Sequence, residues 1–343
     1  MKTNDGLELI ISMKASGPKE GEIEKCKNDS RWIADCKLDG HYFTAYYFPD
    51  LDKRVRFFSG NISVKTGIFT ERTENLMCLQ KDFEDKSFIV CGEIVHSLGK
   101  DAITSVIGGL PKHSIIRQKE LGEPSFVLFD ILYWNGNSYL NVPYEERRNL
   151  LERFRLKQNF FMDFLLKKKD IFYKNNWYVS VTNSILNIPI LDTYDYCINE
   201  GFEGVIYKLK SSLYEPGYIS NGVVRCRRTR NWIKHKKKRQ FDVVIIGYTD
   251  AEYGVTGKYD GMIGAIKFGQ YKYGILTEIG QCSGFIDDLR IDITNNREKY
   301  IGKVMVIESQ ERSSKNDRMR HAQFKGFHPE KRAEDCIYNE WET

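Results

Sequence analysis

The chain has 343 residues, of which 41% are hydrophobic and 29% charged, and its formal net charge at pH 7 is +5. These values describe a soluble globular protein that is long enough for two domains, each with its own core. No stretch is apolar and long enough to span a bilayer, and the eight cysteines include no Cys-x-x-Cys pair. A membrane protein, a zinc site and a disulfide scaffold are therefore disfavoured, and the expected location is the cytoplasm.

The first part of the chain combines predicted strands and helices. Runs rich in β-branched and aromatic residues predict strands over residues 32–37, 42–48, 55–58, 88–95, 125–132 and 204–208. Asp39-Gly40 stands between the first two runs and predicts a β-hairpin. Helices are predicted over residues 144–154 and 192–199, and residues 160–176 are interpreted as a helix with a loop.

The pattern changes after residue 239. Short β-rich runs separated by turns cover residues 241–248, 262–268, 274–280, 303–308 and 322–327, and a helical pattern covers residues 287–300. Short strands with one inserted helix predict a small Greek-key barrel of the OB type. The predicted domains are residues 1–239 and 240–343, in a chain of the α+β class.

A basic run ends the first domain. From Arg225 to Arg239 there is no acidic residue, and the cations are Arg225, Arg227, Arg228, Arg230, Lys234, Lys236, Lys237, Lys238 and Arg239. Trp232 and Ile233 interrupt the run and favour burial, so we predict a structured strand with a basic edge. Polyanions are the natural partners of such a strand.

The tetrad Lys37-Leu38-Asp39-Gly40 is the first candidate for chemistry. A lysine at the end of a strand, beside a tight turn, can hold its amine rigidly in the floor of a pocket. The amine is a nucleophile when it is neutral, and neighbouring cations or a metal favour that form. The tetrad alone is a weak signal, because an exposed turn lysine gives the same pattern.

Later runs supply groups that a nucleotide requires. Glu93 lies in an apolar strand, where its carboxylate suits a ribose hydroxyl, and Phe129 lies in another, where its ring can stack on a base. Glu203 stands at the mouth of a strand and can hold Mg²⁺. By the two-residue period of a strand, Lys234 and Lys236 share a face, which favours an anion such as a triphosphate between them.

In this order and at these distances, the runs resemble those of the covalent nucleotidyltransferases and, among them, the ATP-dependent DNA ligases. The resemblance extends from about Gly21 to Cys336, and it includes residues 257–265, 278–285 and 319–336 of the second domain. It implies a nucleotidyltransferase (adenylation) domain with antiparallel sheets and flanking helices, followed by an OB-fold β-barrel. The similarity of residues 319–336 to the family's closing motif separates DNA ligases from RNA ligases that lack an OB domain.

The resemblance also implies roles for individual residues. Lys37 becomes a lysyl-AMP, and Glu203 and Asp39 bind Mg²⁺. The residues implied for ATP binding are Asp35 at the adenine amine, Asp39, Gly40, the ribose-binding Glu93, the adenine-stacking Phe129, the phosphate-binding Lys234 and Lys236, and Lys331 of the second domain.

The chain departs from the family at three places where arginine is usual, namely Tyr42, Gly60 and His328. In the family these arginines bind the AMP phosphate, the 5′-phosphate of the nick or pyrophosphate. We expect Arg54 or Arg56 to reach the same anion, and His328 to steer pyrophosphate. The residues expected to contact DNA are Arg54, Arg56, Arg225, Arg227, Arg228 and His328.

The implied enzyme uses ATP and Mg²⁺ to seal 3′-hydroxyl/5′-phosphate nicks in double-stranded DNA, and we expect a monomer. Because Lys37 lies near the N-terminus, we expect a compact two-domain ligase of the type found in phages and some viruses. Other functions fit parts of the same pattern. An RNA ligase or an mRNA capping guanylyltransferase would share the lysine chemistry, and a non-catalytic OB-fold DNA-binding protein would use only the basic strand and the barrel.

Overall fold

The computed structural model describes residues 1–3, 5–50, 55–63, 65–81, 83, 86–157, 167, 177–251, 257–310, 312 and 317–338. The chain divides into unit 1, residues Met1–Lys236, and unit 2, residues Lys237–Thr343. This division falls close to the predicted domain boundary after residue 239.

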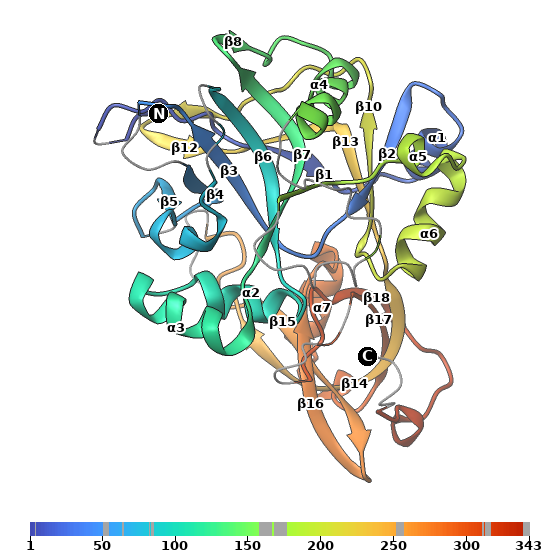
Figure 1. The fold of residues 1–343 in the computed structure, drawn as a ribbon. Coiled ribbons are helices and arrows are strands. Elements are labelled where there is room, and N and C mark those ends of the chain that lie inside the picture. The colour runs from blue at the N-terminus through green and yellow to red at the C-terminus, as the bar shows by residue number, and fades with distance from the viewer. Residues whose placement is uncertain are drawn as a thin grey trace. The chain divides into compact units, whose positions relative to one another are not determined.

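Sheet I of unit 1 has the strand order β1-β13-β10-β2 (Figure 1). β1 (Met13–Ser16) runs parallel to β13 (Arg227–Lys236). β10 (Gly204–Leu209) runs antiparallel to both β13 and β2 (Trp32–Lys37). The sheet therefore joins the beginning of unit 1 to its end, including the predicted basic strand.

Sheet II has the order β5-β4-β3-β6-β7-β8, with β9 beside β7. Its strands are β3 (His41–Tyr47), β4 (Arg56–Ile62), β5 (Phe69–Glu71), β6 (Phe88–Val95), β7 (Ser125–Trp134), β8 (Asn137–Ser138) and β9 (Trp177–Val179). All of these pairs are antiparallel except that of β7 with β9. β6 and β7 are central and almost entirely buried, which explains why their sequences are continuous apolar runs.

The predicted hairpin at Asp39-Gly40 is wrong. β2 pairs with β10 in sheet I, whereas β3 pairs with β4 and β6 in sheet II, so the turn carries the chain from one sheet to the other. Glycine is required in this turn because a β-carbon on Gly40 would lie 2.3 Å from the carbonyl oxygen of Ile94.

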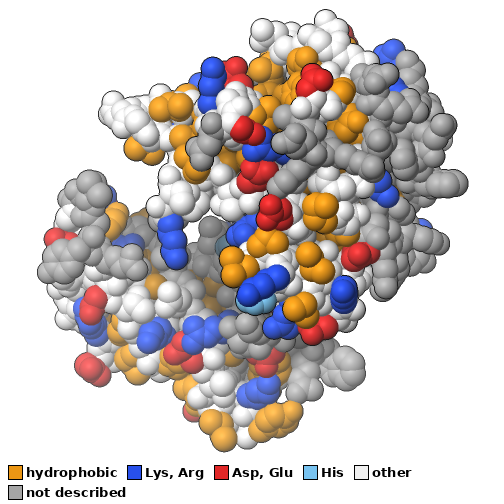
Figure 2. All heavy atoms as spheres, turned by 60° about the vertical axis from the view of Figure 1, so that its left-hand side comes forward, with side chains coloured by type: hydrophobic (Ala, Val, Ile, Leu, Met, Phe, Trp, Pro, Cys, Tyr) orange, Lys and Arg blue, Asp and Glu red, His pale blue; other side chains and the backbone are white. Residues whose placement is uncertain are grey.

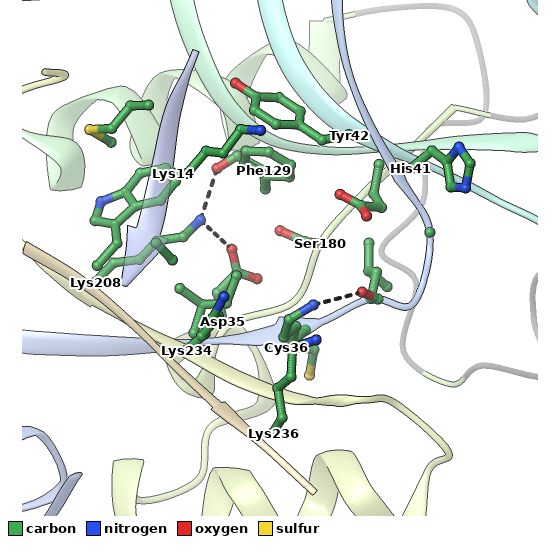
Figure 3. Close-up of a pocket in the computed structure, with 18 of the residues that line it drawn as sticks. Lys14, Asp35, Cys36, His41, Tyr42, Phe129, Ser180, Lys208, Lys234 and Lys236 are labelled. Carbon is green, nitrogen blue, oxygen red and sulfur yellow. Dashed lines mark hydrogen bonds and ion pairs between the residues drawn. The ribbon is translucent and has the colours of Figure 1, made fainter. Parts of the chain in front are cut away.

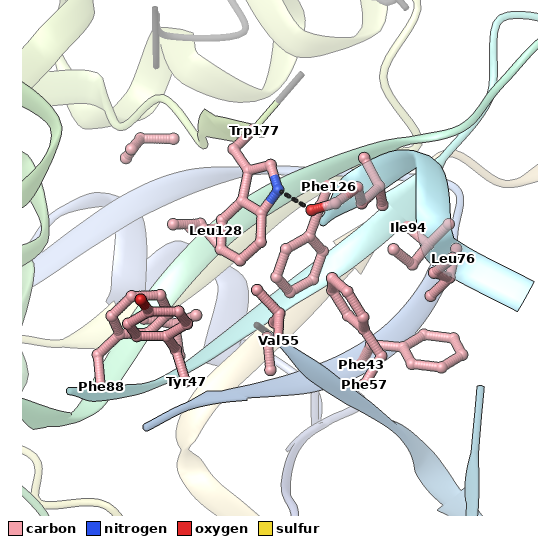
Figure 4. Close-up of a cluster of buried hydrophobic side chains, with 14 of the residues drawn as sticks. Phe43, Tyr47, Val55, Phe57, Leu76, Phe88, Ile94, Phe126, Leu128 and Trp177 are labelled. Atoms are coloured by element: carbon pink, nitrogen blue, oxygen red, sulfur yellow. Dashed lines mark hydrogen bonds between the residues drawn. The ribbon is translucent and has the colours of Figure 1, made fainter. Parts of the chain in front are cut away.

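Aromatic and aliphatic side chains cover one face of sheet II (Figure 4). Trp177 lies among them and donates its indole N–H to the carbonyl oxygen of Leu79 at 3.1 Å, so its one polar group is satisfied. The helices that contribute to this core are η1 (Glu74–Leu79), α2 (Lys100–Ile107), α3 (Pro111–Leu121) and α4 (Tyr144–Lys157).

Helices α5 (Asn183–Leu186) and α6 (Thr193–Asn199) pack on sheet I. The core cluster beneath these helices includes Val205 and Tyr207 of β10. Ile206 and Lys208, which alternate with them along the strand, face the opposite side of the sheet. The remaining elements of unit 1 are α1 (Glu22–Lys27), η3 (Ile190–Asp192) and the hairpin of β11 (Tyr218–Ser220) and β12 (Val223–Arg225).

Unit 2 contains an antiparallel sheet with the order β16-β15-β14-β17-β18. Its strands are β14 (Arg239–Asp250), β15 (Ile263–Lys272), β16 (Ile275–Cys282), β17 (Val304–Ser309) and β18 (Gln323–Phe327). A bridge between Ser283 and Gln323 links the segment after β16 to β18, as a sheet that curls into a barrel requires. The α+β class and the OB-type second sheet are thus confirmed.

The helix predicted over residues 287–300 is present as α7 (Asp287–Asn295) and α8 (Arg297–Tyr300). Asn296 separates them because its φ of −127° is not helical. η4 (Ala333–Asp335) follows β18. The helix and loop expected over residues 160–176 lie outside the described residues, apart from residue 167.

Candidate active site

A pocket of about 380 Å³ is lined by residues of both sheets of unit 1 (Figure 3). The predicted site residues that line it are Asp35, Lys37, Gly40, Glu93, Phe129, Lys234 and Lys236. Glu203 and Asp39 form ion pairs with lining residues, Glu203 with Lys37 and Asp39 with Lys100. The fold therefore brings together groups that are far apart in the sequence.

Strand register explains why these groups meet. Two rows of paired residues cross sheet I from β2 through β10 to β13: Lys37, Gly204 and Lys236 in the first, and Asp35, Ile206 and Lys234 in the second. Residues two apart on a strand share a face, so both rows reach the same side of the sheet.

Lys37 is held by Glu203. Its Nζ lies 2.5 Å from a carboxylate oxygen of Glu203 and 3.2 Å from the carbonyl oxygen of Leu38. The other carboxylate oxygen of Glu203 pairs with Lys236. Burial by itself would raise the pKa of Glu203, but the ammonium groups of Lys37 and Lys236 hold that pKa at about 2. The carboxylate is therefore charged at any physiological pH.

Lys234 lines the same pocket without a carboxylate partner among the described residues. Burial, together with the nearby charges of Arg228, Lys236 and Lys37, lowers the pKa of Lys234 to about 8. A site that lowers the pKa of a lysine in this way is short of negative charge, and a bound anion would supply it.

Glu93 and the tetrad turn form another part of the wall. Burial raises the pKa of Glu93 to about 7, against the opposing effect of Lys37 and Lys100. Gly40 packs so closely on this residue that a β-carbon on it would lie 2.5 Å from Glu93 Cγ. Asp39 Oδ1 lies 3.3 Å from Lys100 Nζ. Carboxylates, lysines and a tight turn therefore meet at one point.

Phe129 and Ile206 line the pocket from different sheets, and both are apolar surfaces on which a flat base can lie. Asp35 also lines it. One oxygen of Asp35 accepts from Lys208 Nζ at 2.7 Å, whereas the other, Oδ1, is buried without a hydrogen-bond partner. A buried acceptor of this kind is suited to an amino group of a ligand.

Lys208 is a site residue that the sequence reasoning missed. Its ammonium donates to Asp35 (Figure 3). The same ammonium lies 4.3 Å from the centre of the Trp232 ring and 3.1 Å from the hydroxyl of Tyr144. Burial is the largest single effect and disfavours its charged form, but Asp35, Tyr144 and Asp130 together outweigh burial and raise the pKa of Lys208. Its position two residues after Ile206 on β10 is the signal that could have identified it.

Tyr42 stands at one of the positions where the resemblance leads us to expect an arginine. Its hydroxyl lies 3.1 Å from Cys91 Sγ and 3.3 Å from the hydroxyl of Tyr214, and its ring centre lies 5.4 Å from that of Phe129. A β-carbon on Gly60 would lie 2.3 Å from this ring. The ring of Tyr42 therefore leaves no room for a side chain at position 60.

The structure does not support the anion contact predicted for Arg56. Its guanidinium donates to Asp5 at 2.6 Å and to Glu71 at 2.7 Å, the residue is 8% exposed, and it does not line the pocket. Two carboxylates already compensate its charge. Arg54 lies outside the described residues.

The other cations expected to contact DNA have different surroundings. Arg225, the last residue of β12, and Arg227 and Arg228 of β13 are all exposed. Arg227 lies 3.8 Å from Glu215, and Arg228 also lines the pocket. In unit 2, His328 Nδ1 accepts from the backbone N–H of Lys331 at 3.0 Å, and Lys331 Nζ pairs with Asp242 at 2.6 Å.

Charges of both signs share the face drawn in Figure 2, where Lys and Arg side chains lie beside Asp and Glu side chains. This mixture agrees with the modest net charge of +5, so we expect anion binding to depend on the local cations of the pocket. The helices of the described residues include none that is both long and apolar enough to cross a membrane.

Carboxylates near Lys37 are the candidate ligands for a metal. Within the described ranges, no cluster of three or more His, Cys, Asp and Glu side chains could hold a metal ion. Glu203, Asp39 and Glu93 act on one another or on the same lysines. They offer oxygen ligands, but further oxygens would have to come from a substrate or from water.

Comparison with known proteins relates the unit that carries this pocket to one family. Residues 13–236 match the profile described as the ATP dependent DNA ligase domain. A probable DNA ligase of Dictyoglomus turgidum is 29% identical over 230 residues, which are 64% of this chain and 34% of that protein. DNA ligase 2 of Methanosarcina acetivorans is 26% identical over 302 residues, which are 79% of this chain and 47% of that protein. The chain therefore spans between a third and a half of the length of these curated relatives.

Solved structures show the same fold. One from a structure–function study of Lig E DNA ligases has a TM-score of 0.58 at 14% identity, and the match covers 93% of this chain and 100% of that one. Another, described as Pmar-Lig_Pre, has a TM-score of 0.64 at 17% identity, and the match covers 94% of this chain and 68% of that one. At these identities the likeness shows the fold alone.

Proposed function

This chain belongs to the family of ATP-dependent DNA ligases, and from that premise we propose that it seals nicks in double-stranded DNA through an AMP carried on Lys37. The observation that carries the proposal is the contact of Lys37 with Glu203 in a pocket that Lys234 and Lys236 also line. A nucleophilic amine, a carboxylate and further positive charge are the groups that nucleotidyl transfer needs.

The first proposed step joins Lys37 to ATP. The neutral Nζ attacks the α-phosphorus, a P–N bond forms, and the P–O bond to pyrophosphate breaks. Lys234 and Lys236 offset the negative charge of the triphosphate and of the departing pyrophosphate. In the same proposal, Lys331 and His328 of unit 2 assist pyrophosphate departure.

The adenosine part of ATP has a complementary surface in the pocket. We propose that the base lies between Phe129 and Ile206, with its amino group donating to the free oxygen of Asp35. Glu93 accepts from a ribose hydroxyl beside the turn at Gly40. These contacts hold the α-phosphate near Lys37, which supplies the orientation that an in-line attack requires.

Mg²⁺ is the metal that fits these residues. Glu203 and Asp39 would hold it together with phosphate oxygens, because Mg²⁺ takes oxygen ligands and often binds through one or two carboxylates plus substrate phosphates. When bound, it supplies neutralisation of charge on the reacting phosphates. Glu203 also orients Lys37 through their ion pair.

The second and third proposed steps transfer AMP to DNA and seal the strand. An oxygen of the 5′-phosphate attacks the phosphorus of lysyl-AMP and the P–N bond breaks. The 3′-hydroxyl then attacks the 5′-phosphorus and AMP leaves. Exposed Arg225 and Arg227, with Arg228 at the pocket, contact the DNA backbone.

A monomeric state, a cytoplasmic location and a phage or viral type stay predictions. The relatives named above are bacterial and archaeal.

The test combines label transfer and nick sealing. Wild type incubated with α-labelled ATP and Mg²⁺ should acquire an acid-labile label, and with a nicked duplex it should yield sealed DNA. Lys37→Ala should do neither. Label from GTP instead of ATP would indicate a guanylyltransferase, and sealing confined to RNA ends would indicate an RNA ligase. Absence of any covalent label, with DNA affinity unchanged in Lys37→Ala, would indicate a non-catalytic DNA-binding protein.

A further inference from the structure

Ser180 lines the pocket from a segment that connects the two sheets of unit 1. The segment directly follows β9, and the backbone N–H of Ser180 donates to the carbonyl oxygen of Leu128 on β7 at 2.8 Å. On its other side, Thr182 forms an antiparallel bridge with Asp35 of β2. Ser180 therefore lies between the strand of sheet II that carries the aromatic wall and the strand of sheet I that carries the nucleophile.

A buried arginine fixes how the hydroxyl of Ser180 can bond. Arg148 of α4 is 2% exposed, and its guanidinium donates to the hydroxyl of Ser180 at 3.0 Å and to the carbonyl oxygen of the same residue at 2.5 Å. A guanidinium has donors only, so the hydroxyl accepts in this pair and its own hydrogen stays available. Over the residues that the structure describes, that hydrogen is donated to no acceptor.

Asp35 offers the opposite group in the same space. Its Oδ1 is buried and accepts no hydrogen bond from the described residues. In Figure 3 the hydroxyl of Ser180 lies in the pocket near the ring of Phe129 and the carboxylate of Asp35. Buried polar groups are seldom left unpaired, so this wall is suited to a ligand that presents an acceptor and a donor side by side.

Adenine presents both groups on either of its edges. Its amino group donates, and the ring nitrogens N1 and N7, which lie on the two sides of the amino group, both accept. Proteins read an unstacked base through hydrogen bonds of this kind to its edges. A hydroxyl that donates beside a carboxylate that accepts is therefore complementary to the amino group and one neighbouring ring nitrogen.

We propose that Ser180 is a base-binding residue, which donates a hydrogen bond to the adenine ring nitrogen beside the amino group that Asp35 accepts. This inference rests on the proposed ligase function and adds a residue to its ATP site. Neither the composition nor the spacing of the sequence singled out Ser180, because its contacts come from strands far away in the chain.

The test combines a substitution with altered bases. Calorimetry without a divalent metal measures binding of ATP, of 1-deaza-ATP and of 7-deaza-ATP, in which a C–H group replaces one ring nitrogen. Wild type should bind one of the two analogues about tenfold more weakly than ATP, because one hydrogen bond is lost. Ser180→Ala should bind ATP more weakly by a similar factor and should no longer distinguish that analogue from ATP. The analogue that wild type rejects identifies the accepting nitrogen as N1 or N7.

Matched variants separate this contact from a structural role. Ser180→Thr keeps the hydroxyl and should keep the discrimination between ATP and the rejected analogue, which a role in packing alone would not predict. Ser184→Ala, at an exposed serine of α5, should bind all three nucleotides as wild type does. Ser180→Ala keeps the bond from Arg148 to the backbone carbonyl, and thermal unfolding of each variant establishes that it is folded.

Two results would overturn the inference. One is wild type that binds both analogues as tightly as ATP. The other is Ser180→Ala that discriminates among the three nucleotides as strongly as wild type, because the contact would then belong to another residue. Failure of the ligase proposal looks different, because wild type supplied with ATP and Mg²⁺ would then form no lysyl-AMP, whatever its affinity for the analogues.

Discussion

The ammonium of Lys37 lies 2.5 Å from a carboxylate oxygen of Glu203, and both side chains are largely buried, with 15% and 12% of their surfaces exposed. The proposed attack on ATP requires the amine of Lys37 to leave this ion pair. Glu203 keeps a counter-charge when Lys37 leaves, because its other carboxylate oxygen pairs with Lys236.

Removing the charge of Glu203 should destabilise the protein. Glu203→Gln leaves Lys37 and Lys236 without their shared carboxylate, and we expect a loss of about 3 kcal/mol in the free energy of unfolding at pH 7. The folded-state pKa of about 2 lies below the ordinary value of 4.5, so the contribution is fully present above pH 4.5 and disappears as pH falls toward 2. Urea unfolding of both proteins between pH 3 and 7 measures it. A difference that does not shrink with acid would contradict this account.

Lys234 should make nucleotide binding depend on pH. Its pKa of about 8 means that it loses its charge in the free protein as pH rises through 8, so affinity for a triphosphate should fall over that interval. Titration calorimetry with a non-cleavable ATP analogue from pH 6.5 to 9 measures this trend. Lys234→Arg keeps its charge throughout, so the drop near pH 8 should be absent. Identical profiles for the two proteins would refute the role.

Asp35 should combine a structural and a selective role. Asp35→Leu leaves the buried ammonium of Lys208 without its counter-charge and should lower the free energy of unfolding by about 3 kcal/mol. Asp35→Leu/Lys208→Met removes both charges and should recover most of that stability. It should not recover the preference for ATP over inosine triphosphate, which lacks the amino group; we expect that preference to fall about tenfold. The preference is measured as the ratio of the rates at which the lysyl adduct forms from ATP and from inosine triphosphate.

The contact between Tyr42 and Gly60 should appear as a coupling energy. Gly60→Arg forces a side chain into the ring of Tyr42, because the β-carbon alone would lie 2.3 Å from it, and should cost about 3 kcal/mol of stability. In Tyr42→Ala the space is open, so adding Gly60→Arg there should cost at least about 1 kcal/mol less. Denaturant unfolding of the four proteins completes the cycle, and strictly additive effects would show that the two positions are independent.

The arginines beside the β11–β12 hairpin should contribute salt-dependent DNA affinity. Arg225→Ala and Arg227→Ala should each weaken binding to nicked and intact duplexes alike, and each should reduce the slope of log affinity against log salt by about 1. Arg117→Ala, at an exposed arginine of α3, is the matched control and should change neither quantity. Weaker binding with an unchanged salt slope would argue against phosphate contact.

Part of the site follows from local sequence alone. Lys234 and Lys236 reach one pocket because residues two apart on a strand share a face, and Trp232 and Ile233 before them favour burial and so indicate a structured strand. Glu93 stands out for a related reason, because its carboxylate interrupts the apolar run of β6. Phe129 is one of several apolar residues of β7, and its stacking role was implied by the family resemblance. The two-residue period of a strand and the cost of burying a charged group are enough to identify such residues as candidates for a functional site.

The rest was decided by which strands become neighbours. The Asp39-Gly40 turn has the local pattern of a hairpin, yet β2 and β3 join different sheets because each finds its hydrogen-bond partners elsewhere. Lys14 faces Arg228, and Asp35 pairs with Lys208, only because strands distant in the sequence adopt one register. Register is set by packing over the whole sheet, which no local pattern contains. The sequence by itself therefore indicated the candidate nucleophile and several of the groups around it, whereas the tertiary structure alone decided which of the pocket's cations lack a carboxylate partner.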